Sequence, residues 1–245
     1  MSLNHPESPD AARPTIVLVH GAFADSSSWN DVIALLHRDG YPVIAAANPL
    51  RGLRADADYV RTLLDSIDGP IVIAGHSYGG SVMSEAADGN PRVQALVYVA
   101  SFILEPGEST GELAAKYPGG ELGPALNPVP LAAAGGPDAA DLYIRQDRFR
   151  AVFAAAVPEE VAALMAVAQR PIVGDALEEK ATRAAWKNIP SWNLVTLQDL
   201  AVPAESQRFM GERAGSHNVE IEASHAVAVS QPEAVARLIV EAARS

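Results

Sequence analysis

The chain contains the stretch Ile71-Val72-Ile73-Ala74-Gly75-His76-Ser77-Tyr78-Gly79-Gly80, from which the rest of its architecture can be worked out. An apolar run of strand character ends here in Gly-x-Ser-x-Gly and passes into a segment that can form a helix. In this pattern a sharp turn between strand and helix lifts the serine side chain into the open on a strained backbone. Gly75 and Gly79 lie where a Cβ would clash with the strand or the helix. The stretch therefore predicts a nucleophile elbow with Ser77 at its tip.

Strand-like and helix-like segments alternate around this stretch. Apolar runs predict strands over residues 15–21, 42–47, 70–74, 93–100, 191–197 and 219–221. Apolar residues at helical spacing predict helices over residues 28–38, 54–67, 80–87, 204–214 and 231–243. Such alternation is typical of α/β proteins whose parallel sheet is covered by helices on both faces. We therefore expect a doubly wound, mostly parallel six-stranded sheet.

The alternation stops between residues 105 and 186. No convincing strand is visible there, and residues 106–137 are rich in glycine and proline. Residues 140–156 and 158–169 have helical character. Because the segment is too long for a loop in a compact domain, we expect a helical cap over residues 105–186. The core would then comprise residues 15–104 and 187–245, and residues 1–14 would form a flexible tail.

Composition excludes several classes of protein. The formal net charge of −12 argues against binding to nucleic acid or to anionic membrane surfaces, which require clustered lysine and arginine. No segment approaches the ~20 apolar residues of a membrane span. The chain has no cysteine, and its first 14 residues lack the apolar core of a signal peptide. We therefore expect a cytoplasmic protein, either a monomer or a homodimer, whose partner is a small molecule and neither nucleic acid nor a membrane.

A serine hydroxyl is a poor nucleophile at neutral pH and needs a base to remove its proton. Two histidines, His217 and His225, lie in the downstream half of the chain. His225 follows the last expected strand and precedes the last helix, where it can approach the elbow. His217 precedes that strand and would lie at the opposite edge of the sheet. This order favours His225 as the base, the alternative being that it only caps the final helix.

The histidine in turn needs a carboxylate that holds it in place. Asp199 lies in the loop after the expected strand 191–197, the position that chain order assigns to the acid. A single aspartate in a loop can also be a turn or capping residue. Glu105, just past the expected strand 93–100, is the second candidate.

The loop after the first strand reads His20-Gly21-Ala22-Phe23. A tetrahedral intermediate carries an oxyanion, which requires two N–H donors aimed at it in advance. We assign one to the backbone of Tyr78, directly after the serine, and the other to the backbone of Ala22. The sequence shows no clustered carboxylates, no His-x-x-x-His and no glycine-rich phosphate loop, so we expect neither metal nor cofactor.

The chain resembles proteins of the α/β-hydrolase fold, in particular the compact group of bacterial esterases, salicylate-binding-type plant methylesterases and hydroxynitrile lyases. The resemblance rests on His20-Gly21-Ala22-Phe23 with Trp29, Gly75-His76-Ser77-Tyr78-Gly79-Gly80, Ala95-Leu96-Val97-Tyr98-Val99-Ala100, Asp199 with Pro203, and Ser224-His225-Ala226-Val227 with Gln231-Pro232-Glu233. It implies a catalytic triad of Ser77, Asp199 and His225, with an oxyanion hole at Ala22 and Tyr78.

Two departures from this group bear on the chemistry. Hydroxynitrile lyases carry a lysine after the catalytic histidine and a threonine after the first-strand histidine, where this chain has Ala226 and Gly21. Cyanohydrin cleavage is therefore not expected. Because the nucleophile is Ser77, the aspartate-dependent dehalogenases and epoxide hydrolases of the same fold are excluded as well.

These observations predict a cofactor-free serine esterase that cleaves a small carboxylic ester through an acyl-enzyme. Alternatives are a C–C bond hydrolase or a perhydrolase on the same triad, or a ligand-sensing protein with little turnover. We expect the cap to determine substrate size. The candidate pocket residues are Phe23 and Trp29 on the core side and Leu126, Tyr143, Phe149, Phe153, Leu164 and Met165 on the cap side, although the latter could equally form the cap's own core.

The choice of acid can be tested by substitution. Asp199→Asn should preserve shape but favour the wrong histidine tautomer, lowering kcat by up to roughly 10⁴-fold. Glu105→Gln should have little effect. If steady-state kinetics show the reverse, with Glu105→Gln damaging and Asp199→Asn mild, Glu105 is the acid.

Overall fold

The structure is a computed structural model and describes residues 13–131 and 139–245. The predicted tail of residues 1–14 therefore lies outside the described residues, except for its last two positions. Arg13, the first described residue, lies over the ring of Tyr41, with its Cζ 5.1 Å from the ring centroid. Within the described ranges no helix has the length and apolarity that a bilayer span requires.

A six-stranded sheet forms the centre of the molecule, and every strand pair in it is parallel. The strand order is β2-β1-β3-β4-β8-β9. The strands are β1 (Thr15–Val19), β2 (Val43–Ala46), β3 (Ile71–His76), β4 (Val93–Val99), β8 (Ser191–Thr196) and β9 (His217–Ile221). The predicted doubly wound sheet is therefore confirmed.

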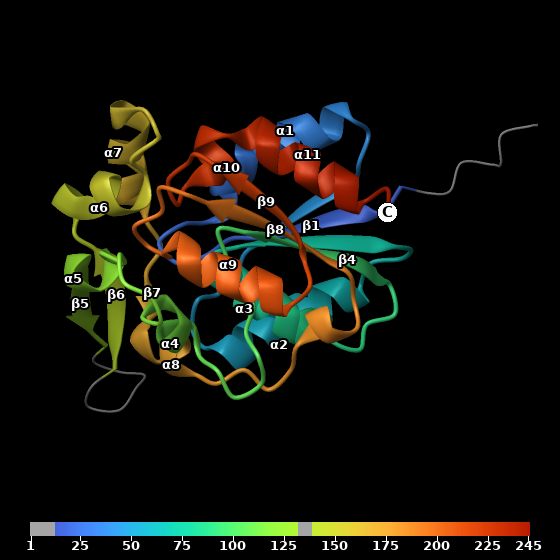
Figure 1. Cartoon of the computed structure of the whole chain (residues 1–245), viewed down its shortest axis with the longest axis horizontal. Coiled ribbons are helices and arrows are strands. Elements are labelled where there is room, and N and C mark those ends of the chain that lie inside the picture. The colour runs from blue at the N-terminus through green and yellow to red at the C-terminus, as the bar shows by residue number, and fades with distance from the viewer. Residues whose placement is uncertain (1–12, 132–138) are drawn as a thin grey trace, which may run out of the picture.

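Helices cover both faces of this sheet (Figure 1). One face packs against the helical turn η1 (Ser26–Trp29), α1 (Asn30–Arg38), α10 (Val227–Ser230) and α11 (Pro232–Ala242). The other packs against α2 (Leu53–Asp65), α3 (Tyr78–Ala87) and α9 (Ala204–Arg213). Alternation along the strands divides the core in two, since successive side chains point to opposite faces. In β1, Ile16 and Leu18 join one cluster while Val17 and Val19 join the other.

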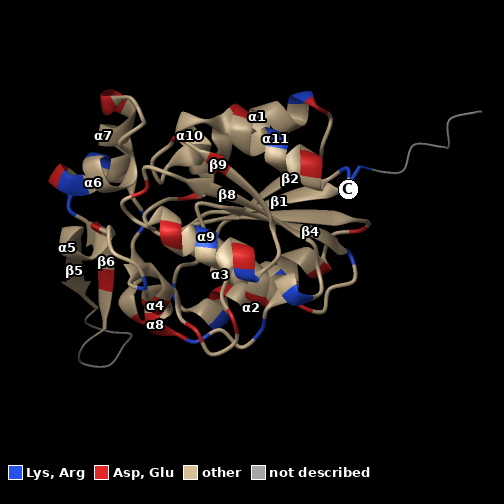
Figure 2. Cartoon of the chain, viewed as in Figure 1, with Lys and Arg blue, Asp and Glu red and all other residues tan. Residues whose placement is uncertain are grey.

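Strands β1, β2, β3, β4 and β8 carry no Asp, Glu, Lys or Arg, whereas the edge strand β9 carries Glu220, and most acidic and basic residues lie on helices and loops (Figure 2). A parallel sheet buried on both faces must read as an almost continuous apolar run. This requirement explains why the strands could be located from the sequence.

In its described residues, the segment between β4 and β8 contains five α-helices, which lie at one end of the central sheet (left in Figure 1), and a short helical turn that packs against α3. They are α4 (Thr110–Ala114), α5 (Leu122–Ala125), α6 (Gln146–Phe153), α7 (Glu159–Ala168), α8 (Gly174–Glu178) and the turn η2 (Ala185–Lys187). The bounds of α7 agree to within one residue at each end with the helix predicted over residues 158–169.

The expectation that residues 105–186 contain no strand is wrong. The segment holds a three-stranded antiparallel sheet, formed by β5 (Leu126–Pro130), β6 (Ala140–Ile144) and β7 (Ile172–Val173). The helix predicted over residues 140–156 is also wrong in its first part, because β6 occupies it and α6 begins only at Gln146. β5 carries two prolines, which an edge strand tolerates but which hide it from sequence patterns.

The elbow turn depends on the absence of a side chain at Gly75. A Cβ there would lie 2.7 Å from the carbonyl carbon and oxygen of Gly79 and from the Cα of Gly80. These are backbone atoms of α3, so the clash could be relieved only by moving the helix.

We expect Gly75→Ala to lower the free energy of unfolding by about 1–3 kcal/mol, the usual cost of overpacking a tight site. Gly123→Ala is the matched control, because a Cβ at that position meets nothing within 4 Å. Urea unfolding of both variants checks this. Equal stability of the two would contradict the close packing of β3 on α3.

Candidate active site

Ser77 occupies the sharp turn between strand and helix that the sequence predicts, directly after β3 and directly before α3. Its backbone has φ 53° and ψ −128°, in a region that non-glycine residues rarely adopt. Such strain costs on the order of 1–3 kcal/mol and persists only where the surroundings enforce it. Here the Ser77 N–H donates to the Val99 carbonyl at 3.2 Å. The Ser77 carbonyl accepts from the Gly80 N–H at 3.0 Å and from the Ser101 hydroxyl at 2.7 Å.

Glycines allow the loop after β1 to lie directly against this turn. A Cβ on Gly21 would be 2.7 Å from Cβ of Ser77 and 2.8 Å from the carbonyl oxygen of His76. A Cβ on Gly79 would be 2.3 Å from the carbonyl oxygen of Val19. The two loops predicted to form the oxyanion hole are therefore in contact.

The geometry leaves the two predicted oxyanion donors available. Tyr78 is the first residue of α3, where a backbone N–H has no carbonyl of its own helix to bond. In the β1 loop, the N–H of Phe23 donates to the carbonyl of Arg170 at 3.0 Å and is thus occupied. Ala22 directly precedes Phe23, so the N–H of Ala22 is the neighbouring donor in the same loop.

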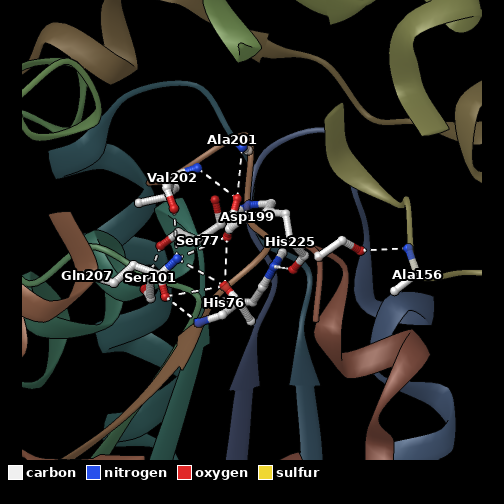
Figure 3. Close-up of polar contacts among 11 residues, drawn as sticks. His76, Ser77, Ser101, Ala156, Asp199, Ala201, Val202, Gln207 and His225 are labelled. Atoms are coloured by element: carbon white, nitrogen blue, oxygen red, sulfur yellow. Dashed lines mark hydrogen bonds and ion pairs between the residues drawn. The ribbon is translucent and has the colours of Figure 1, made fainter. Parts of the chain in front are cut away.

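His225 and Asp199 form a buried pair (Figure 3). Nδ1 of His225 lies 2.7 Å from Oδ2 of Asp199, and the two side chains are 1% and 0% exposed. Because a carboxylate can only accept, Nδ1 carries the proton and Nε2 is left with its lone pair. This is the arrangement that a general base requires.

The carboxylate of Asp199 accepts four hydrogen bonds in addition to that of the histidine. Oδ1 accepts from the backbone N–H groups of Ala201 and Val202, both at 2.8 Å. Oδ2 accepts from the Thr196 hydroxyl at 2.8 Å and from the Gln207 amide at 3.1 Å. A buried charge is tolerated only when it is bonded in this way. The bonds therefore fix both the position and the orientation of the carboxylate.

Sequence reasoning did not single out Thr196 or Gln207. Gln207 is one of many polar residues in α9, and only the structure shows that Ser206 and Gln207 are fully buried. Thr196 is the last residue of β8 and gives no signal that distinguishes it from an ordinary strand residue.

The two other acid and base candidates lie elsewhere. Glu105 forms an ion pair with Lys187, and its side chain is 34% exposed. The ring of His217 stacks on Trp192, with centroids 4.8 Å apart, at the start of β9. That end of the sheet borders a cavity of about 1120 Å³ that is remote from Ser77. The structure thus brings Asp199 to His225 and leaves Glu105 and His217 apart from them.

His76 is a further histidine of the site that the sequence did not assign a role. Its Nε2 donates to the carbonyl of His225 at 2.9 Å, and its ring lies 4.7 Å from the His225 ring. Burial, followed by the proximity of His225, lowers the pKa of His76 to about 3. Burial also lowers the pKa of His20. Both rings are therefore neutral near pH 7.

The predicted pocket residues separate into three groups. Phe23, Leu164 and Met165 line a cavity of about 430 Å³ between the β1 loop and α7, and Ser77 is not part of its lining. Tyr143 lines a second cavity, of about 550 Å³, on the other side of α7. The remaining residues are packed against other side chains.

Among these packed residues, the ring of Phe153 lies 4.9 Å from that of His225. Trp29 is fully buried against His76 at 6.4 Å, inside the core. Leu126 is half-buried in β5, and Phe149 is fully buried beside Phe153. Phe149 and Phe153 thus belong to a packed aromatic group between α6 of the inserted segment and the core, together with Phe23 and His225.

Metal ligands do not gather in the part of the chain that the structure describes: no three or more His, Asp or Glu side chains come together there as an ion would require. The chain has no cysteine to contribute. The expectation of a metal-free and cofactor-free site stays a prediction.

The order of these groups along the chain, with the serine after β3, the carboxylate after β8 and the histidine after β9, is that of an α/β hydrolase. A family model described as the alpha/beta hydrolase family matches residues 16–238. The chain therefore belongs to this family, as its resemblance to the compact esterase group predicts.

Individual relatives agree with this assignment. The chain is 27% identical over 255 residues to the alpha/beta hydrolase nvfD of Aspergillus novofumigatus, covering 94% of this chain and 97% of nvfD. It is 26% identical over 249 residues to a putative chloroplastic methylesterase 11 of Arabidopsis thaliana, covering 93% of this chain and 63% of that protein. The crystal structure of polyneuridine aldehyde esterase superposes with a TM-score of 0.79 at 20% identity, covering 94% and 98% of the two chains.

The neutral His76 makes the stability of the protein dependent on pH. Below pH 6.5 the unfolded chain binds a proton at this residue that the native chain does not bind until about pH 3. Stability should therefore fall as the pH drops below 6.5, by up to about 1.4 kcal/mol per pH unit for this group.

We expect His76→Gln to reduce the slope of unfolding free energy against pH between pH 6 and 4.5. His37→Gln, on the exposed side of α1, is the control and should leave the slope unchanged. Urea unfolding at a series of pH values provides the measurement. An unaltered slope in His76→Gln would show that His76 takes up its proton in the native state.

Proposed function

We propose that the protein is a serine hydrolase that cleaves a carboxylic ester through an acyl-enzyme, with Ser77 as nucleophile, His225 as base and Asp199 as the acid of a triad. One observation supports this most: the buried hydrogen bond between Nδ1 of His225 and Asp199 (Figure 3), on a histidine whose ring lies 4.7 Å from that of His76, the residue before Ser77. The names of the relatives, which include a methylesterase and an esterase, favour an ester as the substrate.

In the first half of the reaction, Oγ of Ser77 attacks the ester carbonyl carbon while Nε2 of His225 takes the hydroxyl proton. The carbonyl oxygen becomes an oxyanion, which the N–H groups of Ala22 and Tyr78 stabilise. Collapse of this intermediate breaks the ester C–O bond. The histidine then gives its proton to the departing alcohol, and the acyl group remains on Ser77.

In the second half, a water molecule takes the place of the alcohol. His225 removes a proton from the water, which attacks the acyl carbon, and the carboxylic acid leaves as the proton returns to Ser77. Asp199 stabilises the imidazolium that forms in each half. Since the pKa values of His76 and His20 are lowered, both of these neighbouring rings stay neutral near pH 7.

We place one side of the ester, either its acyl or its alcohol group, in the cavity lined by Phe23, Leu164 and Met165. Phe23 directly follows the proposed oxyanion donor, so a substrate held by that donor can extend along its ring. The cavity is apolar toward α7, which favours an acyl or alcohol group of hydrocarbon character.

The proposal is tested by labelling Ser77 with a small alkyl fluorophosphonate and by Ser77→Ala. We expect the wild-type enzyme to hydrolyse p-nitrophenyl esters and to take up one phosphonyl group, located at Ser77 by peptide mass spectrometry. Ser77→Ala should lose about 10⁴-fold or more in kcat and bind no label.

A Ser77→Ala variant that keeps a tenth of the wild-type rate would disprove the assignment. Labelling of Ser77 without ester turnover would instead indicate another reaction on the same residues, such as C–C bond hydrolysis or perhydrolysis.

A further inference from the structure

The loop that carries His225, residues 222–226, is bound to the inserted segment on both sides of the histidine. After it, the N–H of Ala226 donates to the carbonyl of Phe153 at 2.9 Å. Before it, the hydroxyl oxygen of Ser224 accepts from the N–H of Ala156 at 3.1 Å, the contact drawn at the right of Figure 3. Both partners belong to the end of α6 and to the α6–α7 turn, residues 154–158.

Individual bonds of this kind have to position the loop, because the regular pairing of the sheet has already ended. The register between β8 and β9 stops at Thr196 and Ile221. The loop is nonetheless buried, with Ser224 at 2% and His225 at 1% exposure. Ser224 is the loop residue whose side chain reaches across to the inserted segment.

The core holds the same histidine from the other side. Nε2 of His76, the residue before the nucleophile, donates to the His225 carbonyl at 2.9 Å. The His225 backbone is therefore clamped between the elbow and the α6–α7 turn. These contacts hold the backbone of His225, while the bond of its Nδ1 to Asp199 holds the ring.

We propose that Ser224 is a positioning residue, which links the α6–α7 turn to His225 and so sets the position of Nε2 relative to Ser77. This inference rests on the proposed function. Ser224 touches neither the nucleophile nor the oxyanion donors, and it acts through the histidine. Because a misplacement of 1 Å can cost about 10²-fold in rate, one side-chain hydrogen bond at this place has a large effect on catalysis.

The link reaches as far as the proposed substrate cavity. α7 begins directly after the α6–α7 turn, and Val161, Leu164 and Met165 of this helix line the cavity beside Phe23. A group that fills the cavity presses on the helix whose preceding turn holds Ser224. Substrate binding and placement of the base are thus joined through residues 154–158.

Substitution of the serine separates positioning from simple stabilisation. Ser224→Ala removes the acceptor, whereas Ser224→Thr retains the hydroxyl. Ser191→Ala is the matched control, because its buried hydroxyl also makes a hydrogen bond, at 2.7 Å to that of Ser216, but at the opposite end of β8. Both alanine variants lose one buried hydrogen bond and should show similar losses of Tm.

We expect the rate of inactivation by a small alkyl fluorophosphonate to fall about 10- to 100-fold in Ser224→Ala, with a similar fall in kcat and little change in KM for p-nitrophenyl acetate. Ser224→Thr should recover to within about threefold of the wild-type rate, and Ser191→Ala should react as the wild type does. Ser224→Ala reacting at the wild-type rate overturns the proposal.

Amide hydrogen exchange tests the same bond in the wild-type protein, should Ser224→Ala fail to fold. Ala156 is exposed, yet its N–H should exchange more slowly than that of exposed Ala155, and more slowly still once Ser77 is phosphonylated. Exchange of Ala156 at the rate of an open amide overturns the proposal. If the fluorophosphonate does not label wild-type Ser77, the proposed function is contradicted. The exchange rate of Ala156 still shows whether its N–H is bonded to Ser224.

Discussion

The close backbone contacts around Ser77 are the constraint on which the rest of the site depends. A serine with φ 53° stays in place because its N–H and carbonyl are bonded to Val99, Gly80 and Ser101. The missing side chains of Gly75 and Gly79 allow α3 to begin against β3 and β1. Strain at one residue is thus offset by hydrogen bonds and packing that the whole sheet supplies.

A buried charge sets the second requirement. The carboxylate of Asp199 is buried, and it accepts hydrogen bonds from two backbone N–H groups and three side chains. The neighbouring His76 has a pKa lowered to about 3, so it carries no charge that would compete with His225 for the aspartate. In the proposed mechanism, the cationic form of His225 therefore has the carboxylate of Asp199 as its counter-ion.

Sequence patterns were sufficient for the sheet and for the placement of Ser77, Asp199 and His225. Strands buried on both faces leave continuous apolar runs, and the chemistry of a serine nucleophile restricts its partners to loops after particular strands. The small sheet of the inserted segment leaves no such pattern. β5 is short and contains two prolines, and β6 is too short for its period to be distinguished from that of a helix.

Contacts that support the site were beyond the reach of sequence reasoning for a different reason. Gln207 and Ser224 are common polar residues whose role comes only from what lies opposite them in space. Trp29, a predicted pocket residue, packs on His76 in the core, since helical spacing alone cannot distinguish a buried residue from one that faces a ligand.

The crystal structure of the enzyme phosphonylated at Ser77 tests the central claim most directly, because it shows where the charged oxygen of a tetrahedral adduct lies. The account predicts that this oxygen lies about 2.7–3.1 Å from the backbone nitrogens of both Ala22 and Tyr78, with the ring of His225 still bonded to Asp199. An adduct oxygen that contacts neither nitrogen, or a phosphonyl group on another residue, would contradict it.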